Sequence, residues 1–263
     1  MSVLLVGGLA CRTPVRLTGS RAAELDAAAR VAWARCLLDV GDAADPESDA
    51  VVACLHGPGE EPDGASATGT ELASVLQQLT QQVTYAKIAA QTGRLLMLHA
   101  GAVAGADGDA IAFVAPGGTG KTTLVRRLGR RFGYLTDETV AVDADARVHP
   151  YPKPLSLRGD AAGPKAETSP DDLGLVRPPA FCRLRRLVLL ARSDDHAGPP
   201  RQEALTRFEA IAALAPETSA LSALPRPLHW LDDLLAGLAP VVRLHYREVD
   251  TVLDTVAGWL ERS

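Results

Sequence analysis

The sequence predicts an α/β fold with a mixed sheet, preceded by a small α+β unit. Apolar residues recur at helical spacing over residues 21–40 and 71–91, whereas short apolar runs typical of strands follow from residue 95 onward. A glycine-rich loop joins one of these runs to a basic helix. We therefore predict a small α+β domain over residues 1–92 and a larger α/β domain over residues 93–263.

The first part of the chain opens with the apolar run Val3 to Val6, which predicts a β-strand. A lipoprotein signal is the less favoured interpretation, because a basic leading segment is missing and the apolar run is short. The composition of residues 57–64 is that of a surface loop. No stretch approaches the length of a membrane helix, so we expect a cytoplasmic protein. Four cysteines without Cys-x-x-Cys spacing are expected to be buried thiols.

The second part alternates strands with a few helices. We expect strands over residues 95–98, 102–104, 110–115, 139–142, 187–191 and 241–245. The sequence Asp107-Gly108-Asp109 predicts a tight turn, and the resulting strand pair indicates a mixed sheet. Residues 159–179 predict a long loop that either receives substrate or is a surface insertion. Residues 250–261 predict a final helix whose apolar side chains, Trp259 among them, belong to the core.

The glycine-rich loop has the features of a triphosphate cradle. It follows the apolar residues Ala112 to Val114 and leads into a helix, so converging backbone N–H groups and the helix dipole would hold an anion. Lys121 would reach the terminal phosphates, and the Thr122 hydroxyl would bind Mg²⁺. The pattern usually opens with glycine, where this chain has Ala115. The predicted nucleotide-binding residues are Ala115, Pro116, Gly117, Gly118, Thr119, Gly120, Lys121, Thr122 and Thr123.

Phosphoryl transfer also needs a carboxylate for the metal and a group that deprotonates the acceptor. After the basic helix, the short apolar run from Gly133 ends in the adjacent acids Asp137 and Glu138. Asp137 would hold Mg²⁺, and Glu138 would accept the proton of a hydroxyl. The alternative is an acidic pair that faces solvent. His99 ends another apolar run; taken alone, a histidine there is more often a hydrogen-bonded core residue.

Three segments in this order resemble the catalytic domain of the HPr serine kinase family. They are Leu98-His99-Ala100-Gly101, Gly118-Thr119-Gly120-Lys121-Thr122, and Gly133-Tyr134-Leu135-Thr136-Asp137-Glu138. The resemblance covers residues 95–158, and residues 150–158 are similar to shorter relatives that include kinases of lasso-peptide precursors. It implies a P-loop kinase domain of the HPr kinase and phosphoenolpyruvate carboxykinase type, which uses ATP and Mg²⁺ to phosphorylate a serine-type hydroxyl. It also implies that His99 and Lys121 assist transfer.

This chain departs from the family at two places. Glu138 replaces the second of two aspartates, and Ser156 stands where a metal-binding glutamate would precede the pair Arg158-Gly159. Lys153 and Arg158 would contact phosphate or an acidic peptide terminus, or be ordinary loop cations.

The sequence leaves three functions open: a peptide or protein kinase, a kinase of a small metabolite hydroxyl, and a nucleotide-binding module without transfer activity. A peptide or protein substrate is the leading expectation for a partner, and a homo-oligomer is possible on the resemblance. The net charge of -5 argues against a nucleic-acid partner, and no membrane partner is expected.

Overall fold

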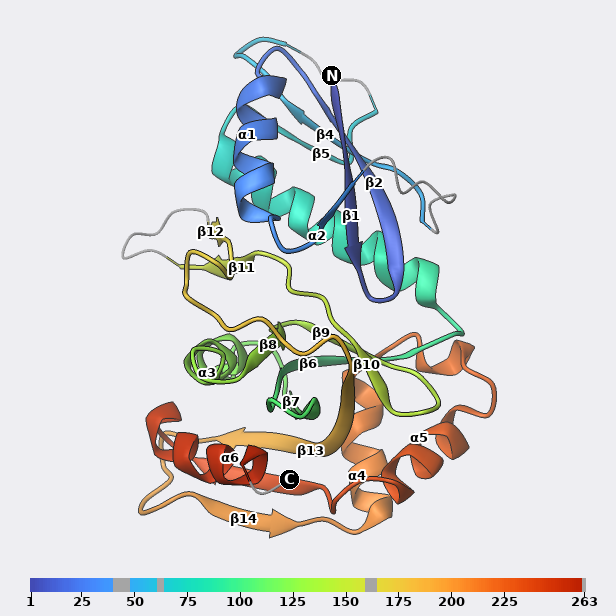
Figure 1. Cartoon of the computed structure of the whole chain (residues 1–263), viewed down its shortest axis with the longest axis vertical. Coiled ribbons are helices and arrows are strands. Elements are labelled where there is room, and N and C mark those ends of the chain that lie inside the picture. The colour runs from blue at the N-terminus through green and yellow to red at the C-terminus, as the bar shows by residue number, and fades with distance from the viewer. Residues whose placement is uncertain (40–47, 61–63, 159–164, 262–263) are drawn as a thin grey trace. The chain divides into compact units, whose positions relative to one another are not determined.

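A computed structural model describes residues 1–39, 48–60, 64–158 and 165–261. The chain forms two compact units (Figure 1). The first comprises Met1–Gln91 and Tyr151–Leu173, and the second comprises Thr92–Pro150 and Gly174–Ser263. Among the described residues, no helix has both the length and the hydropathy that crossing a membrane would require.

The first unit contains a five-stranded mixed sheet in the order β3-β1-β2-β4-β5. The strands are β1 (Ser2–Gly8), β2 (Cys11–Thr18), β3 (Leu37–Leu38), β4 (Val51–Leu55) and β5 (Ala67–Gly69). The helices α1 (Ala22–Ala32) and α2 (Leu72–Gln91) pack together and against this sheet. Their buried positions recur at helical spacing, as in Val75, Leu79 and Val83 of α2. The first unit is therefore an α+β structure with two helices packed on one mixed sheet.

The first unit also includes a segment from the middle of the chain. Tyr151 is fully buried there, with its ring 6.2 Å from that of Trp33 and its hydroxyl 3.0 Å from the Thr84 hydroxyl. The short strands β11 (Leu155–Leu157) and β12 (Ala166–Thr168) then form a hairpin. This differs from the prediction of one uninterrupted domain over residues 93–263. Packing between distant aromatic residues has no signal in local composition.

Three interpretations of the sequence are revised for this unit. The helix expected over residues 21–40 ends at Ala32. The chain turns after it, and the Cys36 carbonyl accepts a bond of 2.6 Å from the Gly7 amide just before β3 begins. Lys153 is not an exposed loop cation, since its side chain is buried and donates to the Pro154 carbonyl at 3.1 Å. Part of the loop predicted over 159–179 is β12, and residues 159–164 lie outside the described part of the chain, as do residues 61–63 of the predicted surface loop.

The second unit is built on a mixed sheet of nine strands. Its main path runs β10-β9-β6-β7-β13-β16-β14, and β8 and β15 also pair with β6. The strands are β6 (Leu96–Ala104), β7 (Asp109–Val114), β8 (Gly133–Thr136), β9 (Thr139–Val142), β10 (Arg147–His149), β13 (Cys182–Arg192), β14 (Arg201–Ala204), β15 (Thr218–Ser219) and β16 (Val242–Tyr246). β6 and β7 are antiparallel, whereas β7, β13 and β16 are parallel. The predicted mixed α/β architecture is confirmed.

Helices cover both faces of this sheet. One face forms the main core with α4 (Arg207–Leu214) and α5 (Pro227–Ala236). The other face meets α3 (Lys121–Leu128) and α6 (Leu253–Leu260), the latter preceded by a 3₁₀ turn over Val249–Val252. Along β6 the even-numbered residues from Leu96 to Ala104 belong to the main core. Since side chains alternate along a strand, His99 and Gly101 belong to the α3 face.

Three further expectations meet the structure here. The two short strands predicted over 95–98 and 102–104 are one continuous strand, β6, which includes Gly101. The final helix is confirmed in outline, but Trp259 is only half-buried. All four cysteines are buried and none forms a disulfide bond, as expected.

Gly101 allows α3 to approach the sheet closely. A Cβ atom at this position would lie 2.6 Å from Val125 Cγ1 and 3.5 Å from the Asp137 Cα. We expect Gly101→Ala to lower the free energy of unfolding by about 1–3 kcal/mol, because overpacking a close contact forces its neighbours apart. Gly117→Ala is the control, since nothing lies within 4 Å of its added Cβ. Chemical denaturation of both variants checks this, and equal midpoints would contradict it.

Candidate active site

The candidate site lies where β6 exchanges neighbours on both of its edges. On one edge β7 pairs with Ala100–Ala104, and β15 takes over at Leu98. On the other edge β8 pairs with residues 102–104, and β9 takes over at His99. Chain segments must leave the sheet at such breaks, and ligand sites of open α/β sheets form where connections diverge in this way. His99 therefore lies between the loop that follows β7 and the turn that joins β8 to β9.

The loop that follows β7 is the predicted phosphate cradle. Pro116, Gly117 and Gly118 are exposed, and Gly118 and Gly120 have φ values of 80° and 99°, which favour glycine. α3 begins at Lys121, directly after Gly120, and the exposed Thr123 lies in its first turn. The remaining cradle residues are the buried Ala115 and the half-buried Thr119, whose hydroxyl donates to the Pro116 carbonyl at 2.8 Å. The backbone thus has the strand–loop–helix form that the sequence predicted.

Lys121 folds back over its own loop. The residue is 6% exposed, and its Nζ donates to the Ala115 carbonyl and, at 3.1 Å, to the Pro116 carbonyl. The ammonium group is therefore held by two backbone oxygens at the start of the loop. Phosphate oxygens entering the loop would meet this charge at once.

Asp137 is brought to the first turn of α3 by the turn between β8 and β9. Its Oδ2 accepts a bond of 3.0 Å from the Thr122 hydroxyl, and its Oδ1 accepts one of 3.2 Å from the buried Tyr134 hydroxyl. Asp137 as a whole is 6% exposed. A solvent-facing acidic pair, the alternative interpretation of the sequence, does not describe Asp137. The two residues expected to share a metal ion are hydrogen-bonded neighbours.

Glu138 and His99 lie beside each other where the pairing of β6 changes from β8 to β9. The Glu138 carbonyl accepts a bond of 3.1 Å from the Ala100 amide, and His99 pairs with Thr139 in the sheet. Both side chains are half-buried. The structure therefore brings together all four residues predicted to take part in transfer: His99, Lys121, Asp137 and Glu138.

Comparisons with known proteins add little to this geometry. No protein-family model matches the sequence, and no curated protein matches it. A solved structure described as the Hpr(Ser) kinase/phosphatase from Coxiella burnetii is similar at 12% identity and a TM-score of 0.31, over 63% of this chain and 93% of that chain. A likeness of this size indicates only a distant structural relationship. The chemistry of the site must therefore be inferred from its own side chains.

The donor set suits magnesium bound together with a nucleotide. Within the described residues, no three histidine, cysteine, aspartate or glutamate side chains form a metal-binding group. Mg²⁺ does not need one, because it is usually held by one or two protein oxygens with phosphates and water completing its shell. The Thr122 hydroxyl and the Asp137 carboxylate supply two such oxygens next to the loop. These residues fit Mg²⁺ as part of a nucleotide complex.

A further acidic residue, Glu217, was missed by the sequence analysis. It ends a 3₁₀ turn after α4, and the next residue, Thr218, pairs with Leu98 of β6. Antiparallel pairing then brings Glu217 level with His99. The negative charge of Glu217 raises the pKa of both Lys121 and His99. Glu217 lies 96 positions after Lys121 in a segment without a recognisable motif, so only the sheet pairing reveals it.

Burial and mutual charge shift the two basic groups of the site. Burial lowers the pKa of Lys121, and this is opposed by the negative charges of Glu217, Asp137 and Glu138. Burial and the positive charge of Lys121 lower the pKa of His99, opposed by Glu138 and Glu217. An ordinary histidine titrates near 6.5, so His99 is neutral at pH 7. A neutral imidazole can donate one hydrogen bond without adding charge.

The affinity for ATP should fall with rising pH sooner than it would for an exposed lysine. Lys121 would bind phosphate only when protonated, and its pKa lies below the usual 10.5, so the charge is lost earlier as pH increases. Among the negative charges that raise the pKa of Lys121, that of Glu217 has the largest effect. Glu217→Gln removes it, so we expect the fall in ATP affinity to move to still lower pH. Calorimetric titration with ATP from neutral to alkaline pH measures both effects.

The matched control for this experiment is Glu248→Gln, which removes the same charge from an exposed position. Its pH profile should coincide with that of the unaltered protein. A Glu217→Gln profile that also coincides would show that Glu217 does not act on Lys121.

Proposed function

We propose that this protein is an ATP- and Mg²⁺-dependent kinase that transfers the γ-phosphate to a hydroxyl group, with a serine of a peptide or protein as the acceptor. The observation that carries the proposal is the 3.0 Å bond between Thr122 and Asp137 beside the glycine loop. In P-loop enzymes a hydroxyl of this loop and an acidic residue after a neighbouring strand hold the magnesium ion together. The same pairing is difficult to explain as a solvated surface feature, because Asp137 is buried.

Each residue of the site has a part in this reaction. The loop amides and Lys121 would bind the β- and γ-phosphates, while Thr122 and Asp137 would hold the metal. When bound, ATP would supply the transferable phosphoryl group, and Mg²⁺ would neutralise its developing charge. Asp137 would serve the metal with Thr122, and Glu138, whose negative charge raises the pKa of both His99 and Lys121, would be the base. Glu138 would accept the hydroxyl proton as the acceptor oxygen bonds to the γ-phosphorus, and ADP would leave with the bridging oxygen.

His99 would orient the acceptor rather than accept its proton. His99 lies on β6 between the turn that carries Glu138 and the loop that follows β7, and its imidazole is neutral at pH 7. A neutral ring would hold the acceptor oxygen by a single hydrogen bond. Protonation at acidic pH would add a positive charge next to Lys121 and alter the binding of phosphate.

Two incubations test the proposal. The purified protein is incubated with Mg²⁺ and γ-labelled ATP, first with a serine-containing acidic peptide library and then with a pool of small hydroxyl metabolites. Label on peptide would support the proposal in full, and label only on a metabolite would replace the peptide acceptor with a small one. Tight ATP binding with no transfer to any acceptor would contradict the kinase assignment and leave a nucleotide-binding module.

A further inference from the structure

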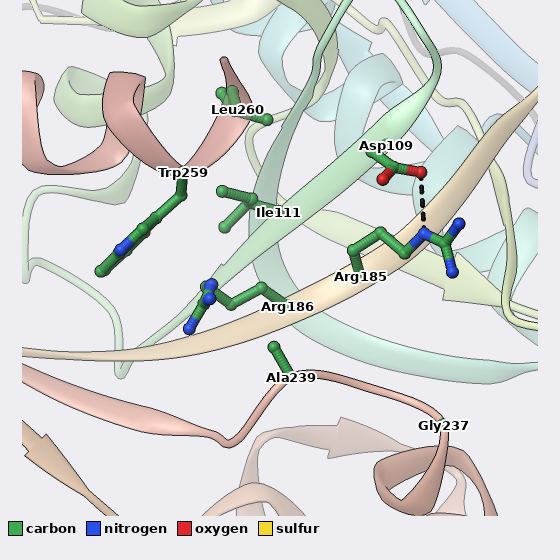
Figure 2. Close-up of a pocket in the computed structure, with 8 residues that line it drawn as sticks. All are labelled: Asp109, Ile111, Arg185, Arg186, Gly237, Ala239, Trp259 and Leu260. Atoms are coloured by element: carbon green, nitrogen blue, oxygen red, sulfur yellow. Dashed lines mark hydrogen bonds and ion pairs between the residues drawn. The ribbon is translucent and has the colours of Figure 1, made fainter. Parts of the chain in front are cut away.

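A pocket of about 250 Å³ lies in the second unit at the start of β7 (Figure 2). This is the opposite end of the strand from the phosphate loop, since β7 runs from Asp109 to Val114 and the loop follows it. The pocket is bounded by β7, β13, the segment before β16 and the end of α6. It is therefore separate from the site described above.

A β-bulge brings two consecutive arginines into this pocket. Leu184 pairs with Ala110 and Arg186 pairs with Ile111, so two residues of β13 oppose a single residue of β7. In a regular strand consecutive side chains point to opposite faces, whereas a bulge changes the direction of one of them. Arg185 and Arg186 consequently line the same pocket.

The two arginines differ in how their charges are matched. Arg185 Nε donates to Asp109 Oδ1 at 2.8 Å, which forms an ion pair. Arg186 instead turns toward Trp259, with its guanidinium carbon 4.8 Å from the ring centre. Within the described residues, no carboxylate pairs with Arg186. The pocket lining thus carries one positive charge in excess.

The environment of Arg186 favours an anion over water. Arg186 is half-buried, so its guanidinium group has lost part of its contact with water, and this burial lowers its pKa. Ile111, Leu260 and the Trp259 ring provide apolar walls on the same side. A partly dehydrated guanidinium gains from a carboxylate, whose two oxygens match its planar fork. The apolar walls would accept the hydrocarbon part of the same molecule.

The geometry points to a binding site for a small organic monocarboxylate, in which Arg186 holds the carboxylate and Trp259 contacts the apolar body. One excess positive charge matches a monoanion, and the volume admits only a small molecule. This site needs neither the phosphate loop nor any residue proposed to take part in phosphoryl transfer. The proposed carboxylate site can therefore be tested independently of the proposed kinase function.

The indole N–H of Trp259 allows a direct test. The chain has three tryptophans, so ¹⁵N-labelled protein gives three indole signals, and Trp259→Phe identifies the relevant one. Titration with sodium benzoate at constant ionic strength should shift this signal in a saturable manner and leave the other two in place. Lys121→Met should give the same titration, because binding at the phosphate loop is not involved.

Three comparisons decide the outcome. Arg186→Gln should weaken binding by about tenfold or more, because a charged hydrogen bond is lost. Arg183→Gln, which removes an exposed charge from the same strand without altering the pocket lining, should not change it. Benzamide, the neutral analogue, should not bind in a saturable manner.

The unshifted signals of the other two tryptophans also report whether Arg186→Gln is folded. If that variant does not fold, Arg186→Lys keeps the charge without the planar fork and should still weaken benzoate binding. A Trp259 signal that does not move up to the solubility limit of benzoate would overturn the inference. Equal affinity in unaltered protein and in Arg186→Gln, or equal binding of benzamide, would overturn it as well.

Discussion

We expect Lys121→Met to lower the rate of phosphoryl transfer by at least about 10²–10³-fold. The ammonium group is bonded to the Ala115 and Pro116 carbonyls at the start of the glycine loop, where it would meet the terminal phosphates. Methionine fills similar space but has no charge to stabilise the transferring group. Initial rates with saturating acceptor, together with calorimetric titration of ATP, measure the loss.

The fold should survive this substitution. Burial already disfavours the charged form of Lys121, so an apolar side chain of similar length is tolerated there. Arg130→Gln is the matched control, because it removes one positive charge from an exposed position just after α3. The control should retain full activity and ATP affinity. Normal turnover by Lys121→Met, with its denaturation midpoint unchanged, would show that the loop is not the phosphate site.

Asp137→Asn should produce a loss of similar size and change how the rate depends on Mg²⁺. Asparagine keeps the shape and can still bond to Thr122, but it lacks the negative charge that attracts the metal. We expect kcat/KM to fall by about 10²–10³-fold and the Mg²⁺ concentration for half-maximal rate to rise. Rates measured over a series of Mg²⁺ concentrations at fixed ATP check both.

Glu138→Gln distinguishes the role of general base from that of metal binding. We expect this variant to lower kcat by about 10²–10⁴-fold, the range for general base catalysis, with an unchanged Mg²⁺ requirement. Asp145→Asn, at an exposed position after β9, is the control for removal of a carboxylate and should behave as the unaltered protein. If Asp137→Asn kept the normal Mg²⁺ dependence while Glu138→Gln lost it, the two roles would have to be exchanged.

Local sequence was sufficient where a feature depends on neighbouring residues. The cradle from Ala115 to Thr122 needs a strand, a flexible turn and a helix in direct succession, and all three have recognisable patterns. The acidic pair after β8 was found for the same reason. Helix ends were less certain, because the end of α1 at Ala32 depends on a hydrogen bond between Cys36 and the distant Gly7.

Contacts between distant segments had no such signal. Tyr151 belongs to the first unit because its ring is buried near Trp33 and its hydroxyl meets Thr84. Glu217 reaches the site through two residues of sheet pairing. Trp259 has the spacing of a core residue but stacks with Arg186 in a pocket, because a bulge in β13 redirects that arginine.

The sequence by itself determined that the chain has a glycine loop between a strand and a helix, the acidic pair after β8, and a mixed α/β architecture. These features depend on residue type, spacing and periodicity, which act over a few neighbouring positions. Only the tertiary structure decided that Thr122 bonds to Asp137 and that His99, Glu138 and Glu217 meet where β6 changes partners. The register of strands far apart in the chain sets those contacts, because pairing fixes which side chains become neighbours.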